Sequence, residues 1–141
     1  MADEASIVEL LGDKGDPIRY TIVAADITKG TLMVLTAAGN RLIAKHAAID
    51  QAFVGILAED TTAASGITTA TVYTNGIFTM HFAAAGATDV GHCVAGAAAA
   101  NAVTPADAND ALQGGLIGNV LETAANDENK IVKVLAHRVG L

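Results

Sequence analysis

The chain has 141 residues, a net charge of −7 and an apolar content of 52%, much of it alanine. A domain of this length can bury a core without disulfides, and the single cysteine, Cys93, excludes an intramolecular disulfide and a cysteine-based zinc cage. The negative charge argues against nucleic acid as a direct partner, because phosphate contacts need clustered Lys and Arg. The acidic start lacks the apolar core of a signal peptide, and no apolar run is long enough to span a bilayer. We therefore expect a soluble protein made in the cytoplasm, with no membrane partner.

Residues 1–17 are predicted to form an arm in front of one β-rich domain, residues 18–141. The arm begins with polar residues, continues with the short apolar stretch SIVELL and ends in a run of turn-forming residues. Two interpretations stay open: an edge strand or single helical turn held on the domain, or a segment that becomes ordered only against a partner. In the second interpretation four apolar side chains anchor the arm: Ile7, Val8, Leu10 and Leu11.

Short β-rich stretches separated by turns follow the arm. Residues 18–24, 31–36 and 41–44 are predicted strands of a meander, with turns spaced as in small barrels and sandwiches. Residues 53–58 (FVGILA) form the next predicted strand. Gly55 inside it predicts a bulge, a bend or the close approach of another backbone.

The clearest local pattern is ITTATVYTNGIFTMHF, residues 67–82. Two β-rich runs flank Asn75 and Gly76, the pair best suited to a type I′ turn, because both central residues of that turn need a positive φ. We therefore predict a core hairpin in which Tyr73 faces Phe78 across the ladder. One face of this hairpin would carry most of the aromatic side chains and nucleate the core. That face consists of Tyr73, Phe78, Met80 and Phe82.

The C-terminal part of the chain predicts one short helix and a closing pair of strands. Thr104 as N-cap, Pro105 at the first position and Asp107 in the first turn predict a helix through Leu112, ended by the glycines at 114 and 115. Residues 116–122 and 130–139 are predicted strands joined by a polar turn. No internal repeat is convincing. The predicted fold class is mainly β: a small single domain with one short helix and an extended N-terminal arm.

Positive charge gathers in two segments. No Lys or Arg occurs between residues 46 and 129, and the basic residues other than Lys14 cluster in 19–45 and 130–138. If these segments adjoin in space, they form a cationic patch on an acidic body, whose partner would be an acidic protein surface. The candidate contact residues are Arg19, Arg41, Lys45, Lys133 and Arg138.

The sequence carries no clear constellation for catalysis or metal binding. The two serines, Ser6 and Ser65, lie in predicted loops outside any nucleophile elbow. Cys93 follows His92, but adjacent residues of a strand point to opposite faces, so a small buried thiol is the favoured role. The four histidines lack the spacing of a metal-binding pair, and no phosphate loop occurs. We expect no enzymatic activity, no metal and no cofactor.

Several short motifs, taken in succession, resemble one family. FVGILA at residues 53–58, a small polar spacer and TATVYTNGIFTM at residues 69–80 are similar to the strand and following strand–turn–strand of the head decoration, or capsid cement, proteins of tailed viruses, including the lambda type. The resemblance extends upstream to KGTLMVL and downstream to GLIGNVLETA followed by IVKV. The alanine-rich residues 95–109 depart from the lambda type and look like an insertion.

The resemblance implies a small β-barrel or β-tulip-like fold and a structural role. Proteins of this family form homotrimers on the outside of the expanded head, at three-fold and quasi-three-fold positions, and stabilise it against the pressure of the packaged genome. The implied partners are the major capsid protein and further copies of the chain. The implied location is the outer capsid surface of the virion, after synthesis in the host cytoplasm. The arm and the basic residues would make the capsid contacts.

Two alternatives remain beside this interpretation. A low-copy tail or baseplate adaptor would share the β-rich, glycine-rich composition. A host-attachment β module that binds a sugar or another small ligand is less favoured, because sugar platforms favour exposed aromatic side chains and the chain has no Trp and only two Tyr.

Overall fold

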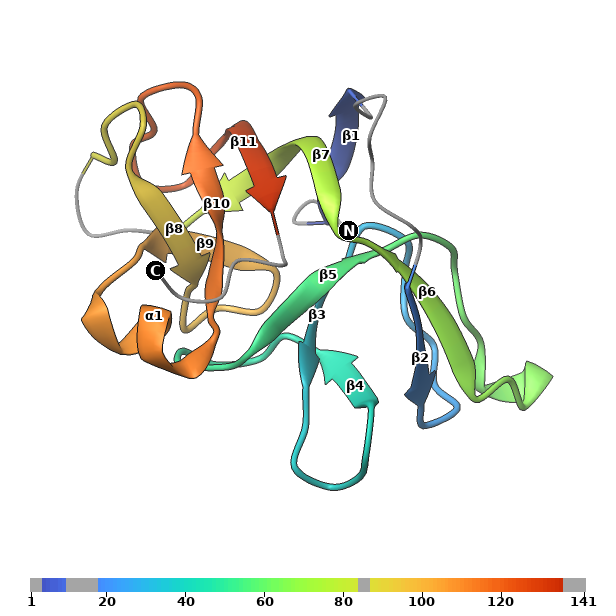
Figure 1. Ribbon diagram of the computed structural model, residues 1–141. Coiled ribbons are helices and arrows are strands. Elements are labelled where there is room, and N and C mark those ends of the chain that lie inside the picture. The colour runs from blue at the N-terminus through green and yellow to red at the C-terminus, as the bar shows by residue number, and fades with distance from the viewer. Residues whose placement is uncertain (1–3, 10–17, 84–86, 136–141) are drawn as a thin grey trace.

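The computed structural model describes residues 4–9, 18–83 and 87–135 (Figure 1). Within these ranges the chain is mainly β, as predicted, with one α-helix, α1 (Ala108–Gln113), and one short 3-10 helix, Ala63–Ser65. Neither helix is long and apolar enough to cross a membrane. The strands form two lobes that lie side by side in Figure 1.

The first lobe is a closed barrel, here called the first ring. Its strands are β2 (Ile18–Ile22), β3 (Leu32–Leu35), β4 (Leu42–Lys45), β5 (Phe53–Leu57) and β6 (Thr69–Tyr73). They pair in the order β2-β4-β3-β5-β6, and β6 returns to β2; only the β2–β4 pair is parallel. The ring encloses its own apolar core, built on Ile22, Ile27, Met33, Ile43, Val54, Leu57, Ala70 and Val72.

The second lobe contains β7 (Asn75–Phe82), β8 (Cys93–Gly96), β9 (Ala102–Pro105), β10 (Leu116–Val120) and β11 (Glu128–Leu135). These strands pair in the order β7-β11-β10-β8-β9, and the parallel pairing of β9 with β7 closes them into a second ring. The larger apolar core fills this ring and includes Phe78, Met80, Phe82, Val94, Val103, Ile117, Val120, Val132 and Val134.

The two rings have the same topology, strand for strand. In each, the second and third strands form a hairpin, the third pairs in parallel with the first, and the first pairs with the fifth. The register corresponds as well: Ile22 pairs with Ile43 in the first ring, as Phe82 pairs with Val103 in the second. The chain therefore contains an internal structural repeat, and the expectation that no repeat exists is wrong for the backbone.

Backbone irregularities recur at equivalent places in the two rings. The register shift between β3 and β5 follows the pair Met33–Gly55, and the shift between β8 and β10 follows the pair Val94–Gly118. A side chain on Gly55 would come within 2.5 Å of the carbonyl oxygen of Tyr73, so this glycine permits the close backbone approach that its place in a strand predicted. A repeat that keeps bulges and glycines but not side chains is hard to detect in a sequence.

The predicted core hairpin is wrong in its pairing. β6 pairs with β2 and β5, β7 pairs with β11, and Thr74 alone separates β6 from β7, so the backbone runs directly from one ring into the other. Asn75 and Gly76 pair with Leu135 and Val134 instead of forming a turn. An eight-residue ladder with β11 buries more apolar surface than a local turn, so tertiary pairing overrides the turn preference.

The apolar face assigned to that hairpin is nevertheless real. Phe78, Met80 and Phe82 are fully buried, and they alternate along β7 with more exposed residues. Tyr73 is partly buried against the same core, and its ring meets that of Phe78 at a centroid distance of 6.1 Å. Period-2 patterning therefore identified the core correctly, although the pairing partner was misassigned.

Helix α1 begins later than predicted. Its N-cap is Asp107, which forms a capping box with Asp110, whereas Thr104 and Pro105 belong to β9. The helix ends at Gly114, whose left-handed φ of 76° agrees with the predicted stop. The predicted closing strands are confirmed as the antiparallel pair β10 and β11.

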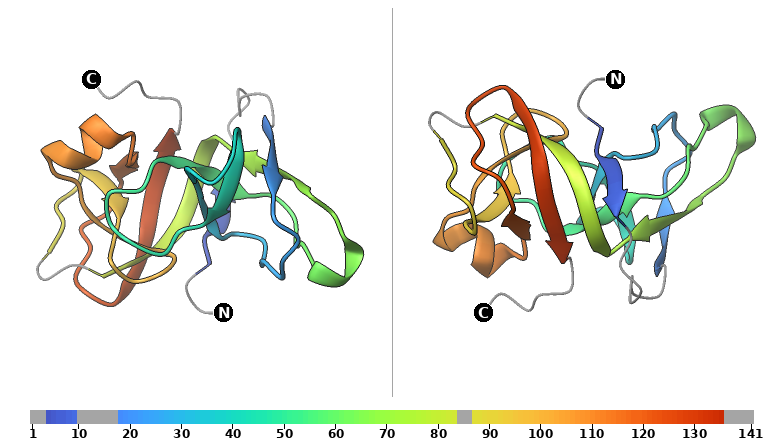
Figure 2. Two further views of the ribbon diagram at one scale, coloured as in Figure 1. Left: turned by 90° about the horizontal axis from the view of Figure 1, so that it is seen from below. Right: turned by 90° about the horizontal axis from the view of Figure 1, so that it is seen from above.

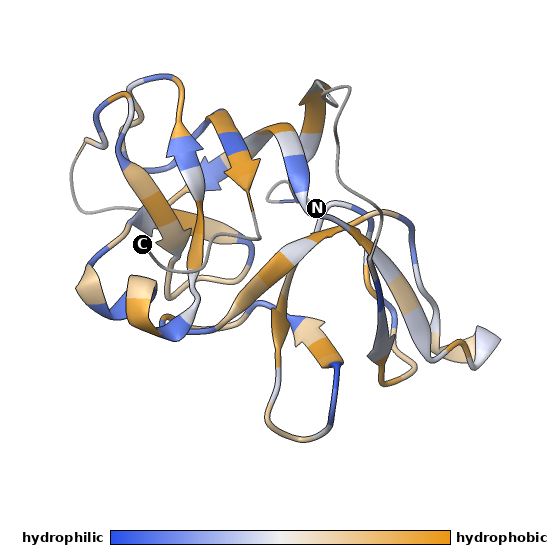
Figure 3. Cartoon of the chain, viewed as in Figure 1, coloured by the Kyte–Doolittle hydropathy of each residue, from blue (hydrophilic) through white to orange (hydrophobic). Residues whose placement is uncertain are grey.

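The rings are held together by hydrogen bonds and by a shared core. The backbone N–H of Leu32 donates to Oδ1 of Asn101 over 3.0 Å, and that of Phe53 donates to the carbonyl of Gly114 over 3.1 Å. Leu32, Phe53 and Ile56 of the first ring are buried in the core of the second. Figure 3 shows the apolar colour along β3 and β5 at this junction.

Candidate functional site

A short N-terminal strand joins the second ring from outside. β1 (Ser6–Glu9) pairs antiparallel with the middle of β7, on the edge opposite β11 (Figure 2, right). Immediately before it, the N–H of Ala5 donates to the carbonyl of Gly30 over 2.8 Å, so the segment also touches the first ring. The edge-strand interpretation therefore describes residues 6–9. The division into an arm and a domain stays a prediction.

Two of the four predicted arm anchors can be placed. Ile7 is 39% exposed and Val8 is 50% exposed, so both present apolar surface to the outside; Ile7 pairs with Phe78, and Val8 lies at the register irregularity that follows it. Leu10 and Leu11 lie outside the described residues. A groove of about 410 Å³ runs beside β1 and is lined by Ile7, Ile56, Tyr73 and Phe78 among others.

Two predicted basic contact residues lie next to each other. The guanidinium of Arg41 donates to the carbonyl of Arg19 over 2.8 Å and lies 5.6 Å from the centre of the Tyr20 ring. The parallel pairing of β2 with β4 brings these residues together, which no local sequence pattern indicates. Lys45 is exposed at the end of β4, on the same ring.

The second basic segment lies on a different ring. Lys133 is exposed on β11, and Arg138 lies outside the described residues. Among the described residues, Arg19, Arg41 and Lys45 therefore belong to the first ring and Lys133 to the second. A single patch formed by both segments stays a prediction.

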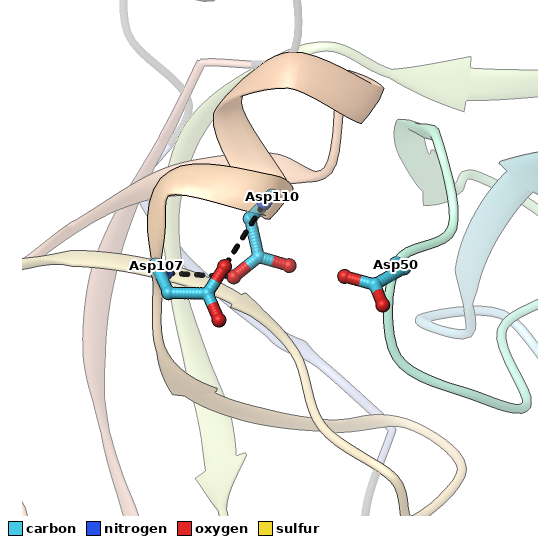
Figure 4. A group of neighbouring side chains, drawn as sticks. All are labelled: Asp50, Asp107 and Asp110. Atoms are coloured by element: carbon cyan, nitrogen blue, oxygen red, sulfur yellow. Dashed lines mark hydrogen bonds between the residues drawn. The ribbon is translucent and has the colours of Figure 1, made fainter.

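Three carboxylates gather where the rings meet, and the sequence analysis did not single them out. Oxygens of Asp50, Asp107 and Asp110 lie within 4.8 Å of one another (Figure 4). Asp107 accepts from the N–H groups of Asn109 and Asp110, and Asp110 accepts from the N–H of Asp107 over 2.8 Å. Burial raises the pKa of the Asp110 carboxyl, and the nearby charges of Asp107 and Asp50 raise it further.

This acidic group is explained by helix capping. Two of its members satisfy the free N–H groups at the start of α1, which is the ordinary role of aspartate at that position. Carboxylate oxygens are ligands that Mg²⁺ and Ca²⁺ prefer, but nothing beyond the cluster itself points to an ion. Asp50 comes from the other ring, so only the Asp107–Asp110 spacing was visible in the sequence.

His46 is a buried polar residue at the ring junction. It is 2% exposed, and its ring lies against Gly96 of β8, where a Cβ atom would overlap it. Burial lowers the pKa of the His46 imidazole below its ordinary value. Its packing against the second ring marks His46 as structural.

Cys93 does not form the thiol–imidazole pair that its position beside His92 invites. Its sulfur is half-buried and lies 3.5 Å from the side-chain nitrogen of Asn119, while His92 is exposed. The two side chains project differently, as adjacent strand residues do.

Comparison with known proteins identifies a family to which the sequence is similar. Residues 12–136 match the family described as phage cement protein. The chain belongs to the phage cement protein family. This membership supports a structural role at the phage head. No curated protein matches the sequence.

The fold of the chain also resembles that of a solved structure. The crystal structure of the head fiber gp8.5 N base in bacteriophage phi29 is 12% identical and superposes with a TM-score of 0.53. The likeness covers 86% of this chain and 94% of that chain, so both rings take part in it.

Proposed function

We propose that this cement-family chain is a structural virion protein that binds the outer surface of the expanded capsid. It would act as a homotrimer at three-fold and quasi-three-fold positions and stabilise the head against the pressure of the packaged genome. Its partners would be the major capsid protein and further copies of itself, after synthesis in the host cytoplasm. The observation that carries the proposal is the match of residues 12–136 to the phage cement family.

The exposed chemistry of the N-terminal region supports a capsid contact. Ile7 and Val8 present apolar surface on β1, although the backbone that carries them is already fixed by β7. A prefolded strand loses little conformational entropy on binding, so a small apolar contact can contribute fully to affinity. Arg19 and Lys45 would meet acidic groups of the capsid. Many repeated weak contacts over a lattice would then give strong attachment by avidity.

Copy number separates this proposal from its main alternative, a low-copy tail or baseplate adaptor. Quantitative mass spectrometry of gradient-purified virions should give copies of this chain comparable to those of the major capsid protein. A handful of copies per particle would favour the adaptor. Absence from purified virions would refute a virion role altogether.

A further inference from the structure

Because of the internal repeat, each ring has an equivalent turn and an equivalent face. In the described part of the chain, the turn of the second ring packs on the face of the first ring, whereas the turn of the first ring and the face of the second do not pack together. Within the chain, the β8–β9 turn of the second ring, with Gly96, Ala100 and Asn101, lies against a receiving face on the first ring. That face is built on Thr28, Thr31, Leu32 and His46. Asn101 bonds to the N–H of Leu32, and Ala100 and Asn101 share a cavity of about 170 Å³ with Thr28, Thr31 and His46.

The same positions on the second ring carry no further ring. Backbone hydrogen bonds fix the correspondence: the N–H of His46 donates to Leu32 as that of Ala106 donates to Cys93. The N–H of Thr31 donates to Thr28 as that of His92 donates to Asp89. We call the matching surface the open face; it consists of Asp89, His92, Cys93 and Ala106. Thr31, Leu32 and His46 of the receiving face are buried, whereas every residue of the open face is exposed or half-buried.

The first ring has a corresponding turn which, among the described residues, forms no hydrogen bond with the second ring; the side chain of its Arg41 bonds to Arg19 of the same ring. The β3–β4 turn corresponds to the β8–β9 turn, because Arg41 and Asn101 occupy matching left-handed positions, with φ of 55° and 59°. We call this the open turn; it consists of Leu35, Asn40 and Arg41. Leu35 is 44% exposed, and Asn40 and Arg41 are also exposed.

The open turn and the open face are complementary in size and in charge. Inside the chain the turn contributes the small residue, Gly96, and the face contributes the large one, His46. In the open pair the sizes are exchanged: the open turn carries the large Leu35 and the open face carries the small Ala106. Inside the chain the neutral Asn101 lies near the neutral Thr28; the corresponding open residues are the cation Arg41 and the anion Asp89. The open turn is therefore complementary to the open face in both side-chain size and charge.

We propose that the open turn of one copy docks on the open face of a second copy, repeating the contact between the rings of one chain. The contact is head-to-tail, with Arg41 of one copy beside Asp89 of the next and Leu35 over Ala106. A head-to-tail contact closes into a ring of copies when its rotation closes. The inference rests on the proposed function only for the number of copies, three.

Mixed-chain cross-linking tests this contact. One chain carries Arg41→Cys and the other Asp89→Cys, both in a Cys93→Ser background, so a disulfide between these sites can form only between copies. Mixing them under oxidising conditions should give a covalent dimer, whereas a Glu59→Cys chain in place of Asp89→Cys should give none, because Glu59 is exposed on the first ring. No cross-link above the Glu59→Cys control, in solution and on particles, would overturn the proposal.

Charge reversal gives a second readout that does not depend on cysteine chemistry. Arg41→Asp or Asp89→Arg alone should weaken self-association by about tenfold or more, since each brings like charges together. The double variant should recover most of the loss, and Glu59→Arg, a charge reversal at an exposed site of the first ring, should change nothing. Light scattering gives the mass, and circular dichroism verifies the fold. Double-variant association as weak as that of the single variants would refute the pairing.

The two proposals fail separately. A chain that cross-links through residues 41 and 89 but does not bind capsids would refute the proposed function and leave this contact intact. A chain that decorates capsids without the cross-link would do the reverse.

Discussion

The contact between His46 and Gly96 gives the sharpest test of how the rings are held together. A Cβ built on Gly96 would lie 2.7 Å from Cδ2 and 3.2 Å from Cε1 of the His46 ring and would also meet Nε2. The His46 imidazole has little room to move, because the residue is buried and its backbone N–H is bonded to the carbonyl of Leu32. Gly96→Ala should therefore force the first and second rings apart locally.

The expected cost follows from overpacking a closed site. Adding one methyl group to a well-packed core costs about 1–3 kcal/mol in the free energy of unfolding. For a chain of this length that corresponds to a drop of roughly 3–15 °C in the melting temperature. Gly39→Ala is the matched control, because neither glycine has a left-handed φ and a methyl at Gly39 would make only an ordinary contact with Leu42. The control should change stability by less than about 0.5 kcal/mol.

A double-mutant cycle completes the test. In the second ring the position equivalent to His46 is Ala106, so His46→Ala should accommodate the new methyl. Urea unfolding of the wild type, both single variants and the double variant gives the coupling energy. We expect the double variant to be more stable than the sum of the two losses indicates. If the two losses in the free energy of unfolding are strictly additive, or if Gly96→Ala causes no loss, the His46 imidazole does not fill this site.

Three further results are expected. The pKa of His46 is lower in the folded chain than in the unfolded chain, so the unfolded chain takes up the proton first as the pH falls. The free energy of unfolding should therefore decrease as the pH drops below about 6.5 and level off below the folded pKa. His46→Ala should flatten this profile in urea titrations. Asp107→Ala removes the N-cap of α1 and should cost about 0.5–2 kcal/mol by thermal unfolding, whereas an unchanged melting temperature would contradict a capping role. Val8→Asp should leave the melting temperature unchanged, because Val8 is half-exposed, but should weaken binding to capsids that lack this chain; full binding in a sedimentation assay would remove β1 from the contact surface.

Local patterning predicted most elements of the fold but not how they pair. The strands at residues 53–58 and 116–122, the helix and the closing pair all lie within a few residues of their observed places. The hairpin prediction failed because turn preference is local, whereas β7 is committed to β11 along its whole length. Residues nearby in the sequence determine where elements begin and end, whereas strand pairing depends on burial of side chains across the whole chain.

The repeat and the candidate surface were hidden for a related reason. Equivalent positions carry Leu32 and Cys93, or Ile56 and Asn119, because one ring buries them and the other does not. The glycines at the shared bulges, Gly55 and Gly118, keep their identity, since the backbone there leaves no room for a side chain. Likewise, the proximity of Arg19 to Arg41 depends on a parallel pairing that no spacing reveals.

The single residue between β6 and β7 has a mechanical consequence. Thr74 leaves no linker that could bend, and the strands on either side of it are each paired along their ring. A displacement of one ring is therefore transmitted to the other through extended backbone without slack, and a hinge motion between them would have to break a ladder first. Under load, the two rings are therefore expected to move as one unit.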